Sequence, residues 1–270
     1  MTMTKVFDCF MFMNEFELLT IRLEELWGAV DFFVLVEGSH THTGNPKPFH
    51  FRDNEAAFEK YKSKLIAKSV ELPVAGKEPW FGWGREIFQR SAINGVLTEH
   101  AQLDDIILSS DVDEIPRVRV IEEYRQHADP CCIEQKTYHY NLNCLMEART
   151  VDPKICRYRT VKDMGVADLR YSHQGRAMHV IKDGGWHLSF MGGTEKIIEK
   201  VKAYAHYDIR DPNIEAYVSR ENVEASVKER KSLFLRDDVR YVGVKGCSDF
   251  PRQIMENVQR YIDLGWIVEP

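Results

Sequence analysis

The sequence predicts an α/β fold in which helices flank a mostly parallel sheet and the second half of the chain adds an antiparallel portion. Short apolar runs at 6–12 and 30–36 are typical of strands that are buried on both faces. Between them, residues 16–27 carry apolar side chains at the spacing of an amphipathic helix. This strand–helix–strand order is the unit of a parallel sheet with a right-handed crossover. Residues 133–146 are aromatic and alternate in places, which indicates antiparallel strands.

The other elements follow in order along the chain. Residues 39–51 contain three histidines and form a loop longer than a simple connector, and loops of this length are often functional. Thr194 is the expected N-cap of the helix that follows it. We expect helices at 55–68, 85–99, 120–127, 195–206, 214–230 and 253–264, a strand at 69–74, a turn at 79–84, and short strands and loops at 151–180.

Length and composition indicate one soluble domain. A chain of 270 residues that is 44% hydrophobic can bury a substantial core. The formal charge of −6 and the absence of a Lys/Arg block argue against a nucleic-acid-binding protein. The six cysteines lack the spacing of a zinc site, and without a signal peptide we expect reduced thiols. No apolar run reaches the roughly 18 residues of a transmembrane helix.

The strongest chemical signal follows the apolar run at 106–108. Asp111, Asp113 and Glu114 come just past the end of this expected strand, where open α/β sheets bind their ligands. In an extended chain Asp111 and Asp113 point to the same side, with Val112 toward the core. Two such acids repel each other unless a cation lies between them, and Mg²⁺ or Mn²⁺ bridging to a diphosphate would meet this need. The alternative is a pair of solvated turn acids.

The run SSDVDEIPR at 109–117 resembles the signature of the glycosyltransferase family that holds β-1,4-mannosyl-glycoprotein β-1,4-N-acetylglucosaminyltransferase, the bisecting enzyme. Further blocks are similar to the same family in the same order, and together they extend to about residue 210. These blocks are FDCF at 7–10 with NEFELL at 14–19 and IRLEEL at 21–26, VEG at 36–38 leading to Thr43-Gly44 and Lys47-Pro48, and GWHLSF at 185–190 with Gly192-Gly193.

The resemblance implies a GT-A-like fold with a Rossmann-type sheet, a nucleotide-sugar donor, a divalent metal and inversion at the sugar carbon. UDP-N-acetylglucosamine is the donor that the family name suggests, and a glycan is the acceptor. We therefore expect residues 1–270 to form a single catalytic domain, with a nucleotide-sugar-binding half at 1–117 and an acceptor-side half at 118–270. Because the sequence begins close to its first expected strand, we expect no membrane anchor or stem, and a cytoplasmic location.

Three residues are the candidate metal ligands. Asp113 is the first choice, and Asp111 would act on the metal directly, through water, or on the donor ribose. His187 is the third, because a neutral imidazole suits Mn²⁺, with a structural histidine as the alternative. Glu114 either orients the acidic pair or faces solvent at the strand end. Trp186 either stacks on a sugar ring or is buried in the core.

The donor-binding candidates lie where strands end and where helices begin. Gly192 and Gly193 open a helix whose free N–H groups could hold a phosphate. Arg85 could pair with phosphate, as could Arg90, for which a surface salt bridge is the alternative. The full set of donor-binding candidates is Asn14, Glu15, Glu37, Thr43, Lys47, Arg85, Asp111, Gly192 and Gly193.

An inverting transferase also needs a general base for the acceptor hydroxyl. Asp183 and Glu195 are the candidates, and Asp163 and Asp249 stay open beside them. Two other functions fit the same residues. One is a metal-dependent phosphohydrolase built on the aspartate pair, and the other is a non-catalytic module that binds a glycan or a nucleotide sugar on the same fold.

Overall fold

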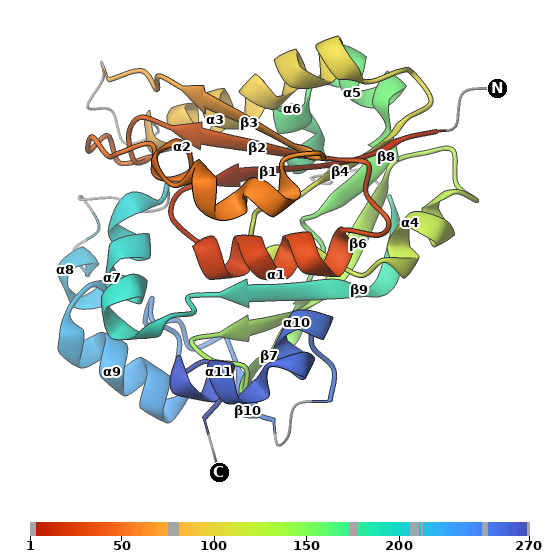
Figure 1. The fold of residues 1–270 in the computed structure, drawn as a ribbon. Coiled ribbons are helices and arrows are strands. Elements are labelled where there is room, and N and C mark those ends of the chain that lie inside the picture. Colours follow the sequence, from red (N-terminus) through yellow and green to blue (C-terminus); the bar gives the residue numbers. More distant parts are fainter. Residues whose placement is uncertain are drawn as a thin grey trace.

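The structure is a computed structural model of the chain. A mixed sheet of ten strands runs through the part of the chain that it describes, and helices cover this sheet on both faces (Figure 1). The residues that the structure describes are 4–74, 81–172, 178–205, 211, 213–244 and 248–268.

The first half of the chain builds the parallel half of the sheet. Its strands lie in the order β3, β2, β1, β4, and each pair of neighbours is parallel. The elements of this half are β1 (Val6–Phe12), α1 (Phe16–Leu26), β2 (Phe32–Gly38), α2 (His50–Asp53), the 3₁₀ helix η1 (Glu55–Tyr61), β3 (Leu65–Val70), α3 (Phe81–His100), β4 (Ile106–Ser109) and β5 (Glu114–Pro116).

The second half extends the sheet from β4 with mostly antiparallel pairs. Strand β8 pairs with β4 and β6, β7 pairs with β6 and β10, and β9 runs parallel to β6 but antiparallel to β5. The elements are α4 (Arg119–Tyr124), β6 (Cys131–His139), β7 (Cys144–Thr150), β8 (Lys154–Arg157), α5 (Tyr158–Met164), α6 (Val166–Tyr171), β9 (His179–Ser189), α7 (Gly193–Ala203), α8 (Ile214–Tyr217), α9 (Arg220–Glu229), β10 (Tyr241–Gly243), α10 (Arg252–Glu256) and α11 (Val258–Asp263).

The parallel strands are apolar on both faces because each face packs against its own helices. Phe10 of β1 joins a core with α1, whereas its neighbour Cys9 joins a second core with α3, α5 and α6. Figure 1 shows α1 on one side of these strands and α3, α5 and α6 on the other. Successive strand residues therefore enter opposite cores, which explains the continuous apolar runs in the sequence.

The fold class is confirmed, since helices flank a sheet whose first half is parallel and whose second half is largely antiparallel. The first strand and the helix after it also lie where the sequence predicts them. The described cysteines, at 9, 131, 132, 144 and 156, are buried and unbonded, and Cys247 lies outside the described residues. Among the described helices, none has both the length and the apolar character needed to span a membrane.

Several predicted elements are wrong. The predicted helix at 55–68 is a 3₁₀ helix that ends at Tyr61, because the following residues pair with β2 as strand β3. Residues 158–171 form helices α5 and α6, not strands and loops. Gly192, not Thr194, is the N-cap of α7. Residues 81–84 belong to helix α3, while the start of the predicted turn at 79–84 lies outside the described residues.

Candidate active site

The turn between β4 and β5 carries the acidic residues. The Asp111 N–H donates to the Glu114 carboxylate (2.7 Å), and the Glu114 N–H donates to the Asp111 carbonyl oxygen (3.0 Å). The chain therefore closes a tight turn here, which corrects the prediction of an extended chain between the two aspartates. Val112 is buried in the core as predicted, and Asp111 and Asp113 both line one cavity.

Arg22 of α1 holds this turn in place. Its guanidinium and the Asp8 carboxylate are both fully buried and are joined by hydrogen bonds of 2.5 and 2.7 Å. The same guanidinium donates to the carbonyl oxygens of Asp111 (2.8 Å) and Glu114 (2.9 Å) and to the Ser110 hydroxyl (2.6 Å). Buried carbonyl groups need a hydrogen-bond donor, so this one arginine both pairs with the carbonyl oxygens of the turn and fixes the position of the turn.

Two arginines form ion pairs with the Asp111 carboxylate. Arg90 of α3 donates to one carboxylate oxygen at 2.9 Å, and Arg170 of α6 donates to the other at 3.1 Å. Arg170 also forms a bidentate pair with Glu114 (2.7 and 2.8 Å). Burial acts to raise the pKa of Asp111, but the two guanidiniums outweigh burial and hold this pKa well below its usual range. Asp111 is therefore ionised and has both of its oxygens paired.

Asp113 has a different set of partners. The Lys200 Nζ atom of α7 lies 2.5 Å from Asp113 Oδ2, and His187 Nε2 lies 3.6 Å from the same oxygen. Burial acts to raise the pKa of Asp113, but Lys200 and His187 lower it more, so the carboxylate is ionised. Antiparallel pairing of β9 with β5 sets His187 opposite Glu114 and so brings it to the acidic turn.

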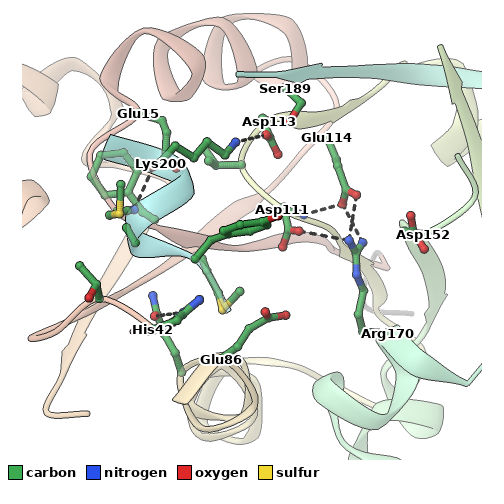
Figure 2. Close-up of a pocket in the computed structure, with 18 of the residues that line it drawn as sticks. Glu15, His42, Glu86, Asp111, Asp113, Glu114, Asp152, Arg170, Ser189 and Lys200 are labelled. Atoms are coloured by element: carbon green, nitrogen blue, oxygen red, sulfur yellow. Dashed lines mark hydrogen bonds and ion pairs between the residues drawn. The ribbon is translucent and has the colours of Figure 1, made fainter. Parts of the chain in front are cut away.

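These groups face a cavity of about 490 Å³ at the carboxyl ends of β1 and β4. Figure 2 shows Lys200 extended toward Asp113, and Arg170 facing Asp111 and Glu114. Aromatic side chains form part of the wall, and they are Phe12, Trp83, Tyr171, Phe190 and Tyr204. The cavity thus combines ionised groups at its centre with apolar ring surfaces, a combination suited to a ligand that carries both charge and sugar rings.

Some of the predicted site residues line the cavity. Glu15 and Lys47 line it together with the three candidate metal ligands Asp111, Asp113 and His187. Glu114 is buried and joins the turn to Arg170, so it orients the acidic turn as expected. Their roles in donor or metal binding stay predictions.

Other donor-binding candidates hold the fold together. The Glu37 carboxylate accepts the N–H groups of Phe51 and Arg52 at the start of α2, and it is 1% exposed. Arg85 donates to the carbonyl oxygens of Pro73 and His42, which anchors the loop at 39–49. Neither side chain lines the cavity, and their roles in donor binding stay predictions.

The remaining donor-binding candidates lie beside α7 or at its start. Asn14 donates to Glu199, and the Thr43 hydroxyl donates to the Lys202 carbonyl oxygen. Gly192 and Gly193 begin α7, whereas Lys200 and Ala203, near its other end, line the cavity. Asn14, Thr43, Gly192 and Gly193 do not line the cavity, and their roles in donor binding stay predictions.

Trp186 does not present a ring to a sugar. Its side chain is 2% exposed and belongs to the core between β9 and the C-terminal helices. Arg117 covers the ring at 4.0 Å from its centroid, and the indole N–H donates to the Asp249 carbonyl oxygen. The core alternative is correct for Trp186, and the stacking prediction is wrong.

The two candidate bases are also away from the cavity. Asp183 is about half exposed and pairs with Arg117, Arg119 and Lys136 near the other end of β9. Glu195 is exposed in the first turn of α7 and pairs with Arg220. Neither lines the cavity, which favours another residue as the base.

Sequence reasoning missed Arg170 and Lys200. Arg170 lies in α6, within a stretch that has no long periodic pattern, although Val166 and Leu169 mark a short helix. Lys200 lies between Ile197 and Val201, the buried positions of α7. A lysine on the apolar side of a helix is a signal for a partnered or functional cation.

Comparison with known proteins gives a family match. The model of the family described as Glycosyltransferase family 17 matches residues 1–236. The chain is 32% identical over 109 residues to the beta-1,4-mannosyl-glycoprotein 4-beta-N-acetylglucosaminyltransferases of Homo sapiens and Rattus norvegicus. That stretch covers 38% of this chain and 20% of each relative, so the match spans about a fifth of the relatives' length.

Among solved structures, the apo form of mouse xyloside xylosyltransferase 1 is similar over 99% of this chain and 94% of its own. The sequence identity is 7% and the TM-score is 0.33. This likeness is too distant to carry an argument.

The pKa of His139 gives a prediction for stability against pH. Burial, followed by the charges of His187 and Lys200, lowers this pKa to about 3. In the unfolded chain His139 takes up a proton near pH 6.5, whereas in the folded protein it stays neutral down to about pH 3. The stability of the folded state that depends on neutral His139 is therefore fully present above about pH 6.5 and is lost as pH falls toward 3. Between pH 7 and pH 5 the wild type should lose about 2 kcal/mol more unfolding free energy than His139→Gln loses. Urea unfolding of both proteins at the two pH values measures this difference, and equal losses would contradict it.

Proposed function

The chain belongs to glycosyltransferase family 17, and we propose that it transfers N-acetylglucosamine from UDP-N-acetylglucosamine to a glycan hydroxyl with inversion. The observation that carries this proposal is the acidic turn, which stands in a cavity at the carboxyl ends of parallel strands with two independent sets of cationic partners. Ligands of open α/β sheets bind at this edge. The donor sugar rests on the names of the relatives.

The shape of the site supports an elongated donor. Met13, Thr41, Lys47 and Ala203 line both the main cavity and an adjoining cavity of about 230 Å³. The two spaces together suit a ligand with a nucleoside at one end and a sugar at the other. Lys47 and Lys200 are cationic groups on this wall, and they are suited to the diphosphate between those ends.

We propose that Asp113 and His187 hold a divalent metal, Mn²⁺ or Mg²⁺. Both line the cavity, and His187 Nε2 lies 3.6 Å from Asp113 Oδ2. The other ring nitrogen of His187, Nδ1, is buried without a hydrogen-bond partner among the described residues. Asp111 is committed to two arginines, so its role is to anchor the turn. The described residues contain no group of three His, Cys, Asp or Glu side chains around one point, which leaves further ligand positions to phosphate oxygens and water. When bound, the metal would stabilise charge on the departing diphosphate.

We propose Asp152 as the general base. Glu15 lies near Lys200 and Lys47, on the side assigned to the diphosphate. Asp152 lines the same cavity on the other side of Asp111 (Figure 2). In a single displacement the acceptor hydroxyl attacks opposite the leaving group, so the base belongs on that far side.

The loop that carries Asp152 has a fixed position. Lys154 is fully buried in β8, and its ammonium donates to the carbonyl oxygens of Val151 (3.0 Å) and Asp152 (2.5 Å). Strand β8 in turn pairs with β4, with Lys154 opposite Ser109 at the end that leads into the acidic turn. The backbone of Asp152 is thus tied to the same sheet edge as the metal-binding candidates, as a base in this role requires.

Donor binding tests the first part of this proposal. Calorimetry with a panel of nucleotide sugars in Mn²⁺ should give the tightest binding for UDP-N-acetylglucosamine, and a chelator should weaken it. Asp113→Ala should weaken binding at least about tenfold, because it removes the carboxylate of the metal pair. Binding of no nucleotide sugar, with or without metal, would contradict the transferase proposal and favour the phosphohydrolase.

Turnover tests the assignment of the base. Release of UDP from the donor in the absence of acceptor measures slow attack by water. Asp152→Asn should reduce this rate by about 10²-fold to 10⁴-fold while donor affinity is kept, because only proton transfer is lost. The matched controls are Asp183→Asn and Glu195→Gln, which should keep the wild-type rate. A rate in Asp152→Asn equal to that of the controls would remove Asp152 from this role.

A further inference from the structure

We propose that Lys200 is a built-in competitor of the metal at Asp113, so that metal binds well only when the donor diphosphate draws the ammonium away. The inference rests on the proposed function, since it needs a metal at Asp113 and a diphosphate in the same cavity. It adds a cause that lies in this chain's own residues: a single lysine that competes with the metal for Asp113 and so makes metal binding depend on the nucleotide.

The first observation is the contact itself. Lys200 Nζ lies 2.5 Å from Asp113 Oδ2, and this is the same oxygen that His187 Nε2 faces at 3.6 Å. The ammonium therefore occupies the carboxylate oxygen that Asp113 would offer to a metal beside the imidazole nitrogen of His187. A cation of two charges cannot bind that oxygen while the ammonium remains, because the two cations would repel each other at short range.

The second observation is that the Lys200 side chain is more exposed than that of Asp113 and is longer and more flexible. The Asp113 side chain is 5% exposed, and its backbone carbonyl accepts the Leu188 N–H (2.8 Å) in the pairing of β5 with β9. The Lys200 side chain is 23% exposed, lines the cavity and passes over the Phe190 ring. A lysine ammonium on its flexible four-carbon stem can change partner within one cavity.

The third observation is the contrast with Asp111. Its two oxygens are paired with Arg90 and Arg170, and Arg170 is also held by the bidentate pair with Glu114. Those guanidiniums are fixed in a network, whereas in the part of the chain that the structure describes the Lys200 ammonium forms its ion pair with Asp113 alone. Of the two aspartates, Asp113 is therefore the one whose cation can be exchanged.

The exchange makes binding of metal and nucleotide mutually dependent. Without nucleotide, the metal must displace the Lys200 ammonium, which has no other anion as close. The apparent affinity for the metal is then the intrinsic affinity multiplied by the fraction of molecules in which Asp113 is free. With a diphosphate in the cavity, the ammonium gains phosphate oxygens as new partners and the metal gains them as ligands. By thermodynamic reciprocity, metal must strengthen nucleotide binding by the same factor.

Mn²⁺ titration of the full chain by calorimetry tests the inference, first without nucleotide and then with saturating UDP. Without nucleotide, Lys200→Met should bind Mn²⁺ about tenfold more tightly than the wild type, which corresponds to Lys200 holding Asp113 in about nine molecules of ten. With UDP present, the wild type should match or exceed the variant, because its ammonium then contacts the diphosphate. Lys200→Arg keeps a cation in place and should behave as the wild type.

The matched control is Lys196→Met. Lys196 lies one turn earlier on α7, is exposed and pairs with Glu199, so its removal changes the net charge equally without touching Asp113. This variant should bind Mn²⁺ as the wild type does. Circular dichroism and the unfolding midpoint show whether each variant is folded before titration.

Two outcomes would overturn the inference. Equal Mn²⁺ affinity in Lys200→Met and wild type without nucleotide would show that the lysine does not compete, and the proposed metal pair would stand. Failure of every variant to bind Mn²⁺ even with UDP would remove both the competition and the metal. In that second case, calorimetry with UDP-N-acetylglucosamine alone decides whether the donor part of the proposed function survives.

Discussion

The buried pair of Arg22 and Asp8 is the interaction on which the rest of the site depends. Both side chains are fully buried. The guanidinium N–H groups of Arg22 donate to the Asp8 carboxylate of β1 and to backbone carbonyl oxygens of the acidic turn. Burying two charges gives little net stability, so the pair is better understood as a device that fixes geometry. It joins the first strand, the first helix and the turn after β4 at one point, and this point determines where Asp111 and Asp113 face.

From that point the charges extend in two directions with different properties. On one side Glu86, Arg90, Asp111, Arg170 and Glu114 alternate in sign, and each carboxylate in this series has a guanidinium partner. On the other side Asp113 meets a lysine and a histidine, and all three line the cavity. The first group holds the turn in place, and the second is the one that we propose exchanges partners with a ligand. A transferase that must bind and release a charged donor needs both properties.

The sequence predicts the parts of this arrangement that depend on local patterns. Apolar runs identify β1 and β4, and the order of elements identifies the edge of the sheet at which Asp111 and Asp113 lie. Alternation in β9 also separates His187, which lines the cavity, from Trp186 and Leu188, which enter the core, so the error for Trp186 was avoidable. The position of Arg170 could not be predicted in this way, because it depends on how α6 packs against α3 and on a pairing with Glu114, 56 positions away in the sequence. Strand β3 was likewise determined by pairing with β2 and not by its own residues.

The most direct test of this account compares Arg22→Met with the double variant Asp8→Leu, Arg22→Met in two measurements: urea unfolding and binding of UDP-N-acetylglucosamine with Mn²⁺. The single variant leaves a buried carboxylate unpaired and should lose about 3–5 kcal/mol of unfolding free energy. The double variant replaces the pair with apolar side chains and should regain part of that stability, although the carbonyl groups of the turn still lack a hydrogen-bond donor. It should bind UDP-N-acetylglucosamine at least about tenfold more weakly than the wild type, because Arg22 no longer holds the turn. A stable double variant that binds the donor as tightly as the wild type would contradict the claim that this buried pair positions the site.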